Sequence, residues 1–339
     1  MKRFFKTALI LLTVLMILSV SGTLFAGGSK EEAKEASYPR GNFDFVAPAG
    51  AGGGWDLTIR TTAKVLKDTG LVKVPMPVRN NPGAGGAVNL ASLQELKGKD
   101  NTITVYSPPL ILINLNGTTE LGYKNVTPLS RLIADYAAYV VAADSPYKTM
   151  NDVMTVLKKD IKGVKIGGIS AAGSMDHIQF LIMAKAAGVK NLNQIDYVSF
   201  DDSAVAQVLG GHIDLFSTGL SEVQGLIESK DLRALAQSAD HRVGEGIIKD
   251  IPTCKEQGID ATFVNWRGLF GPPEMPDYAV TYWRETLAKM VKTPEWAAAK
   301  KTNGWDDAYL DAPDFAKFLV QVNEDYKIVL SEIGMLKAK

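Results

Sequence analysis

The sequence predicts an α/β fold organised as two domains. Short apolar stretches of strand length alternate with amphipathic helical patterns over most of the chain. Several predicted strands run through Gly, Ala or Ser directly into a predicted helix. The chain has 339 residues, 46% of them hydrophobic. That is enough for one large core or two moderate ones, and two fit this length better.

The first 26 residues have the three-part pattern of a secretory signal peptide. Lys2, Arg3 and Lys6 precede a long apolar run, and small residues follow near Ala26. The run approaches the length of a membrane span, so an uncleaved anchor is the alternative. The small residues and the polar segment after them favour cleavage, and no cysteine lies near the cleavage position for lipid attachment. The charged, small residues 27–41 predict a flexible leader.

The predicted elements follow one another in a regular order. The first part has a strand at 43–49, a helix at 56–69, a strand at 74–80, a loop and helix at 81–98 and a strand at 101–109. The middle part has a β-rich run at 137–146, a helix from 149 or 151, a strand, loop and helix at 164–188, and a strand and helix at both 196–211 and 212–229. Strands at 232–239 and 261–273 follow, and after them the chain is mostly helical.

Four loops that join a predicted strand to a predicted helix consist mainly of Gly, Ala and Ser. They cover residues 50–54, 83–86, 170–174 and 217–221. The first N–H groups of a helix have no partner within the helix and lie at the positive end of its dipole. Because the carboxyl ends of parallel strands meet at one edge of a sheet, these helix starts are expected to converge. The sequence therefore predicts a site for a small anion that needs no cationic side chain.

Two residues at the first loop have more than one function open to them. Asp56 is most simply the N-cap of the helix, and it can also shape a ligand-binding loop. Trp55 lies in a glycine loop, without a strand or helix face against which to pack. This position favours a place for Trp55 on the wall of a ligand cleft.

The known phosphate, nucleotide and nucleophile motifs do not fit these loops. A P-loop needs Lys and Ser or Thr after its last glycine, where this chain has Trp55 and Asp56. The third glycine of a dinucleotide fingerprint is replaced by Trp55 in the first loop and by Val88 in the second. GGISAAGS resembles a nucleophile elbow around Ser170, but Ala172 occupies the place of the second glycine.

The histidine and cysteine content gives no metal or disulfide pattern. His177, His212 and His241 are far apart, and none has a second His or Cys one helical turn away. His177 stays a candidate site residue because of the loop before it. The single Cys254 excludes an intrachain disulfide. With 37 basic and 37 acidic residues and no basic stripe, nucleic acid is not an expected partner.

The order of several motifs resembles one known family, the periplasmic substrate-binding receptors of tripartite tricarboxylate transporters (TctC or Bug family). The resemblance extends from about Phe43 to the C-terminus and rests on APAGAGGGWDLTIR, VRNNPGAGGAVNL, GSMDH, VLGGHIDLFSTGLSEV, LRALAQSADHR, IPTCKEQG and NWRGLFGPP. The chain departs from the family pattern at Ala49 and Ala51, which flank Gly50, and in FDDSAV, which lacks a glycine pair.

The resemblance implies the two-lobe fold of type II periplasmic binding proteins, with a ligand cleft between the lobes. Two strands would cross between the lobes, near residues 138–142 and 262–266. Lobe 1 would then comprise residues 38–138 plus 266–339, and lobe 2 residues 139–265. Hinge closure would bury the ligand.

The resemblance also implies a receptor that holds a small carboxylate by backbone N–H groups and small hydroxyls, partly through water. With the candidates named above, the expected ligand-binding residues are Gly52, Gly53, Gly54, Trp55, Asp56, Gly85, Ser107, Ser170, Ala172, Gly173, Ser174, His177, Asp201, Ser217 and Thr218. Asp201 is equally well an N-cap residue. The expected partners are the ligand and the small and large membrane subunits of the transporter, and the expected state is a periplasmic monomer without cofactor, metal or enzymatic activity.

Two other functions stay open at this point. One is a secreted or periplasmic hydrolase that uses Ser170 or Ser174 with His177. The other is a two-lobe sensory receptor that docks on a signalling kinase in place of a permease.

Overall fold

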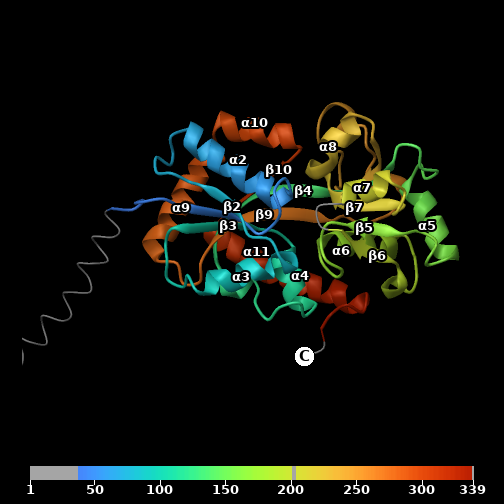
Figure 1. The fold of residues 1–339 in the computed structure, drawn as a ribbon, viewed down its shortest axis with the longest axis horizontal. Helices are drawn as coiled ribbons and strands as arrows, with labels where there is room; N and C mark the ends of the chain where they lie inside the picture. Colours follow the sequence, from blue (N-terminus) through green and yellow to red (C-terminus); the bar gives the residue numbers. More distant parts are fainter. Residues whose placement is uncertain (1–36, 201–203, 338–339) are drawn as a thin grey trace, which may run out of the picture.

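The computed structural model describes residues 37–200 and 204–337. In these residues ten strands join in one sheet, and helices cover both of its faces (Figure 1). The fold is the α/β fold that the sequence predicts. The expected signal peptide, residues 27–36 of the expected leader and Asp201 lie outside the described residues.

The strands are short except for β4, which pairs with strands in both halves of the sheet. They are β1 (Asp44–Ala47), β2 (Val78–Asn80), β3 (Thr102–Tyr106), β4 (Thr127–Ala142), β5 (Ile166–Gly168), β6 (Tyr197–Ser199), β7 (Leu215–Gly219), β8 (Leu232–Gln237), β9 (Val264–Gly271) and β10 (Asp306–Asp311).

The α-helices mostly follow strands, as in other α/β folds. They are α2 (Gly54–Asp68), α3 (Ala87–Gln94), α4 (Pro109–Leu115), α5 (Met150–Lys159), α6 (Met175–Ala186), α7 (Ala204–Leu209), α8 (Leu220–Glu228), α9 (Asp277–Met290), α10 (Pro294–Asn303) and α11 (Ala312–Glu332).

The sheet has two halves that share β4, with the order β2-β1-β3-β9-β4-β7-β5-β6. In the first half β1 lies parallel between β2 and β3, and β9 is antiparallel to β3 and to residues 127–136 of β4. In the second half β5 lies parallel between β6 and β7, and residues 137–142 of β4 pair with β7 and β8. The strand β4 therefore changes partners between Tyr136 and Ala137. The lobe bounds 38–138 plus 266–339 and 139–265 stay a prediction.

Three local predictions from the sequence are wrong. The strand β4 begins at Thr127, ten residues before the predicted β-rich run, because Pro128 and the polar residues after it hide the strand pattern. The acidic edge strand β10, DDAYLD, lies in a region predicted as mostly helical. The helix α2 begins at Gly54 with Gly53 as its N-cap, so Asp56 lies inside the first turn and is not the N-cap.

The hydrophobic core continues on one face of the sheet and is divided on the other. One cluster joins both halves and contains Leu112, Phe180, Trp266 and the single cysteine, Cys254, all of them buried. A second cluster packs around β1, α2 and α9, and a third around α7 and α8. In Figure 1, α4, α6 and α11 lie on one side of the sheet and α2, α8 and α10 on the other. On the face where the core is divided, polar groups have room between the two halves of the sheet.

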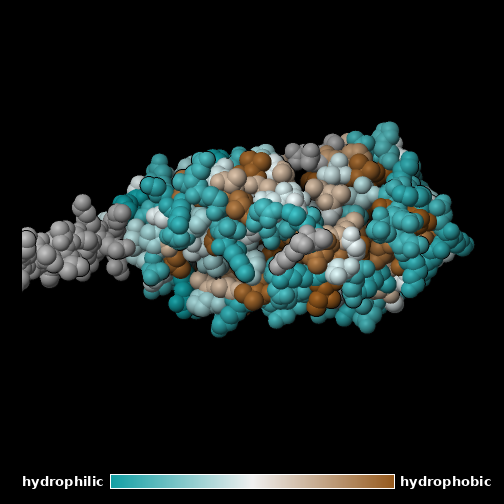
Figure 2. Space-filling model, turned by 90° about the horizontal axis from the view of Figure 1, so that it is seen from below, coloured by the Kyte–Doolittle hydropathy of each residue, from teal (hydrophilic) through white to brown (hydrophobic). Residues whose placement is uncertain are grey.

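The surface has no large apolar band on the face that Figure 2 shows. Hydrophobic side chains form separate small groups among hydrophilic ones there. Single exposed apolar side chains are normal on a folded protein. Within residues 37–200 and 204–337, no helix combines the length and the apolar character that a membrane crossing needs.

Candidate functional site

A cavity of about 490 Å³ lies between the two halves of the sheet. Its wall comes from the loops before α2, α3, α4 and α6 and the first residues of α2, α4 and α6, together with one residue of α8 and two of β9. The lining residues are 48–50, 53–55, 82–85, 107, 109, 169–171, 174–176, 222, 265 and 267. The carboxyl ends of several strands thus face one common space, where helix starts are able to contribute backbone N–H groups.

The first glycine loop is held in place by Asp56. Its carboxylate accepts hydrogen bonds from the N–H of Gly52 at 2.9 Å, from Asn80 at 2.8 Å and from Arg60 at 2.8 Å. Burial alone would raise the pKa of Asp56, but these hydrogen bonds outweigh it and hold the pKa below its usual value. Asp56 is therefore ionised at neutral pH and fixes the turn that opens α2.

Trp55, the second residue of α2, lies on the cavity wall. The indole N–H donates a hydrogen bond to Ser107 Oγ at 2.9 Å. The ring meets Tyr106 edge-on, with 5.5 Å between centroids, and lies over Gly86. These contacts orient a half-buried aromatic surface toward the cavity.

The second glycine loop needs glycine for conformational reasons. Gly83, Gly85 and Gly86 have φ of 137°, 63° and 99°, a region that other residues rarely adopt. Gly86 also lies so close to the rings of Tyr106 and Trp55 that a side chain would collide with them. The phenol of Tyr106 donates to the carbonyl of Gly86 at 3.0 Å. The loop is thus locked against the wall that carries Trp55.

The loop before α6 is organised by a buried carboxylate, Asp176. It accepts hydrogen bonds from the N–H groups of Ile169 at 2.9 Å and Ser170 at 2.8 Å, while its own N–H donates to Ser170 Oγ at 2.7 Å. Burial and the nearby charge of Glu222 raise the pKa of Asp176 to about 7, against the lowering effect of these hydrogen bonds. The side chain is 1% exposed and lines the cavity.

His177 packs behind the same loop, and neither of its ring nitrogens forms a hydrogen bond with a serine hydroxyl of the described residues. Its Nδ1 accepts a hydrogen bond from the N–H of Gly173 at 3.0 Å, and its ring stacks on Tyr197 at 4.3 Å. Burial lowers the pKa of His177 to about 4, so the imidazole is neutral near pH 7. Ser170 Oγ already accepts the N–H of Asp176. This geometry differs from the paired nucleophile and base of a hydrolase.

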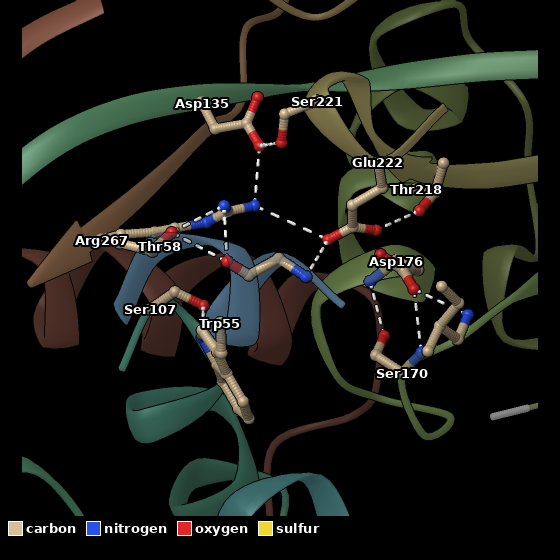
Figure 3. Close-up of polar contacts among 12 residues, drawn as sticks. Trp55, Thr58, Ser107, Asp135, Ser170, Asp176, Thr218, Ser221, Glu222 and Arg267 are labelled. Carbon is tan, nitrogen blue, oxygen red and sulfur yellow. Dashed lines mark hydrogen bonds and ion pairs between the residues drawn. The ribbon is translucent and has the colours of Figure 1, made fainter. Parts of the chain in front are cut away.

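The most buried part of the site is a polar cluster around Arg267, which is 1% exposed (Figure 3). The guanidinium of Arg267 donates to the carbonyl of Gly54 at 2.8 Å and to Thr58 at 2.9 Å. It also donates to Asp135 at 2.7 Å and lies 3.6 Å from Glu222. Since Trp266 points into the continuous core, the next residue of β9 points to the opposite face, where α2 meets α8.

Glu222 joins this cluster to the second half of the sheet. Its Oε1 accepts the N–H of Gly54 at 3.1 Å, and its Oε2 accepts the hydroxyl of Thr218 at 2.6 Å. Asp135 is held in turn by the hydroxyl of Ser221 at 2.6 Å. The start of α2 therefore contacts the start of α8 through a chain of charged hydrogen bonds.

A family comparison gives the context of this cavity. Residues 62–335 match the model of the tripartite tricarboxylate transporter family receptor, TctC. The chain belongs to this TctC family. Members are periplasmic substrate-binding receptors, so the resemblance predicted from the motifs is confirmed.

Individual TctC-like proteins are similar along nearly the whole chain. The "UPF0065 protein in gbd 5'region" of Cupriavidus necator is 24% identical over 328 residues, which cover 95% of this chain and 97% of that protein. The structure of a Rhodopseudomonas palustris protein with adipate has a TM-score of 0.79 and 19% identity, covering 88% of this chain and 99% of the other. MatC of Rhodopseudomonas palustris with bound malate has a TM-score of 0.74 and 19% identity, covering 86% and 100%. These structures share the two-lobe fold predicted for this chain.

The predicted ligand-binding residues separate into two groups in the structure. On the cavity wall lie Gly53, Gly54, Trp55, Gly85, Ser107, Ser170 and Ser174. Behind or beside the wall lie Gly52, Asp56, Ala172, Gly173, His177, Ser217 and Thr218. Asp201 lies outside the described residues. Contact of any of them with a ligand stays a prediction.

Sequence reasoning missed the charged residues of the site. Among the described lining residues Asp176, Glu222 and Arg267 are charged, and none of them belongs to the ligand-binding residues predicted from the sequence. All three lie inside stretches that carry the family resemblance, GSMDH, SEV and NWRG. A usable signal was Arg267 itself, a cation inside an otherwise apolar strand pattern, because such a charge is rarely buried without partners.

The described residues contain no group of three or more His, Cys, Asp or Glu side chains placed to hold a metal ion. The polar cluster around Arg267 combines one cation with carboxylates and hydroxyls. This cluster is therefore an ion-pair network.

Proposed function

We propose that this protein is a non-enzymatic periplasmic receptor that binds a small organic carboxylate between its two halves and delivers it to a tripartite tricarboxylate transporter. The observation that carries the proposal is one cavity faced by glycine, alanine and serine loops from both halves. Membership of the TctC family and the malate and adipate bound by two structural relatives support the ligand class.

The proposed binding mode uses the main chain. A ligand carboxylate accepts hydrogen bonds from N–H groups of the glycine loops before α2 and α3, since unpaired N–H groups near helix starts favour negative charge. Trp55 covers an apolar part of the ligand, and the hydroxyls of Ser107 and Ser174 lie on the same wall. Closure of the lobes about β4 and β9, the strands proposed to cross between them, then buries the ligand.

The proposal treats Ser170, Ser174 and His177 as structural and ligand-facing groups. A hydrolase needs a hydroxyl activated by a base within hydrogen-bond reach. His177 instead accepts the N–H of Gly173, and the Asp176 N–H occupies Ser170 Oγ. Incubation of the purified protein with the acids that it binds should return them unchanged by mass spectrometry.

A binding screen tests the function directly. Thermal unfolding of the purified protein is measured with millimolar di- and tricarboxylates, aromatic acids and amino acids, followed by calorimetry on each hit. A ligand that binds only the folded state raises the midpoint by mass action, by about 2.7 kcal/mol at a concentration one hundred times Kd. Failure of every acid to raise the midpoint would refute the proposal.

Export and delivery are tested in cells. We expect N-terminal sequencing of the exported protein to begin near residue 27, and the protein to sediment as a monomer. Uptake of the identified acid should require this chain together with a small and a large membrane subunit. Uptake that persists after deletion of the chain would separate it from transport.

A further inference from the structure

The start of α2 already holds a carboxylate of the chain itself. The N–H of Gly54, in the first turn, donates to Glu222 Oε1 at 3.1 Å. The side chain of Glu222 is 13% exposed and lines the cavity. Thr218 holds its other oxygen at 2.6 Å, so the carboxylate has a fixed direction. A ligand that approaches this end of the cavity therefore meets a negative charge beside the helix start.

The one cation near Glu222, Arg267, offsets its charge only in part, because Arg267 also pairs with Asp135. Among the described lining residues Arg267 is the one cation; it lies 3.6 Å from Glu222, but its two terminal nitrogens donate to other groups of the chain, including Asp135 at 2.7 Å. Asp176 adds a second carboxylate to the lining, close enough to Glu222 for the two charges to interact. In Figure 3 the side chains of Glu222 and Asp176 lie next to each other. The cavity end between α6 and α8 is therefore rich in acceptors and net negative.

A third, uncharged acceptor points to the same chemistry. Asn265 is 1% exposed and lines the cavity, and its Oδ1 has no hydrogen-bond partner among the described residues. Asn265 and Arg267 lie two positions apart on β9, so their side chains share one face of the sheet. A buried acceptor without a partner destabilises the fold, and a donor on the ligand removes that cost.

We propose that the ligand is a carboxylate that also carries an ammonium group, which binds against Glu222 and Asp176 while the carboxylate faces the glycine loops. The proposal rests on the proposed function and names its substrate class. An ammonium group has three N–H donors and no acceptor, and Glu222, Asp176 and Asn265 offer acceptors for all three. A second carboxylate at this end would face two like charges, with the Arg267 guanidinium already engaged by Asp135.

Calorimetry with matched pairs of acids tests the ligand class. The pairs are aspartate and succinate, glutamate and glutarate, alanine and propionate, and 4-aminobutyrate and butyrate, which differ in each case by the ammonium group. In at least one pair the aminated acid should bind 100-fold or more tightly than its partner. If the unaminated acid binds as tightly in every pair, the ammonium proposal is overturned and the carboxylate receptor stands. If neither these acids nor the wider screen gives binding, both proposals fail.

Two variants, each of which removes one negative charge, test the assigned residues. Glu222→Gln and Asp176→Asn should each weaken the aminated acid at least 30-fold and leave the affinity of the unaminated acid unchanged or higher. Glu228→Gln removes the same charge from the same helix at an exposed position and should change neither affinity. An unchanged preference for the aminated acid in both site variants would overturn the role of these carboxylates. If one variant does not fold, the other variant and the matched pairs of acids still test the proposal.

Discussion

The carboxylate of Glu222 accepts a hydrogen bond of 3.1 Å from the backbone N–H of Gly54, a residue 168 positions earlier in the chain. The contact joins the first turn of α2 to the first turn of α8. It leaves no room for a side chain at residue 54, because a Cβ there would overlap Arg267 Nη2 and Glu222 Oε1.

Gly54→Ala should therefore reduce both stability and ligand affinity. We expect a loss of about 2–4 kcal/mol in the free energy of unfolding, since the new methyl group separates buried charges from their partners. The control is Gly53→Ala, where φ is −70° and the nearest atom to the new Cβ is an ordinary contact at 3.6 Å. Urea unfolding measures both variants. Equal midpoints for the two would contradict the close packing at Gly54.

Arg267→Met should be strongly destabilising, by about 3–5 kcal/mol, because it leaves Asp135 buried without its cation. Arg284→Met removes a cation from a half-exposed pair with Asp311 and should cost less than about 1 kcal/mol. The double variant Arg267→Met, Asp135→Asn should recover part of the loss. Urea unfolding of the three variants checks the series, and equal costs for the two arginines would show that burial of the pair is irrelevant.

Asp176→Asn should stabilise the protein at pH 8 and do so less as the pH falls. The folded-state pKa of Asp176 is raised from 3.8 to about 7 by burial and by the Glu222 charge. The protonated form is thus favoured in the fold, and ionisation costs stability as the pH rises from about 4 to 7. That cost, at most about 4 kcal/mol, is removed in the variant. The test is the difference in unfolding midpoint at pH 8 and pH 5, which should shrink toward pH 5. A difference independent of pH would contradict it.

His241 should stabilise the fold more at acidic than at alkaline pH. Hydrogen bonding to Asp240 and the charge of Asp306 raise its pKa above 6.5. The stabilisation is complete below pH 6.5 and is lost as the pH rises through the higher folded-state pKa. Because the ring is 59% exposed, the effect is at most about 1 kcal/mol. His241→Gln should lower the melting temperature at pH 5.5 and leave it nearly unchanged at pH 8.5. In an Asp306→Asn background the loss at pH 5.5 should be smaller, and an equal loss would exclude this contact.

Features encoded by local sequence were the ones open to prediction. The helix start at Thr149 is an example, because Thr149 and Asp152 form a capping box within four residues. The two glycine loops were also recognisable, since their composition is required by backbone conformation and close packing. Both features are set by neighbours in the chain.

Features that depend on distant partners were not predictable in the same way. The strand β4 extends past Pro128 because β9 and β10 pair with it, and neither pairing is visible in the local pattern. The cluster of Asp135, Glu222 and Arg267 comes from three separate regions of the chain. In the sequence, Asp135 and Glu222 look like ordinary surface charges, and Arg267 alone stands out by its place in an apolar strand pattern. Their contact follows only from the strand order, which brings the three residues together.

The burial of Cys254 makes movement of the two halves directly measurable. The thiol is 0% exposed, and burial raises its pKa to about 12, so it stays unreactive toward maleimide dyes at neutral pH. One cysteine engineered on the surface of each of the two halves of the molecule would then be labelled without first removing the native thiol. Fluorescence energy transfer between the two dyes would report opening and closing in real time, with the natural core intact.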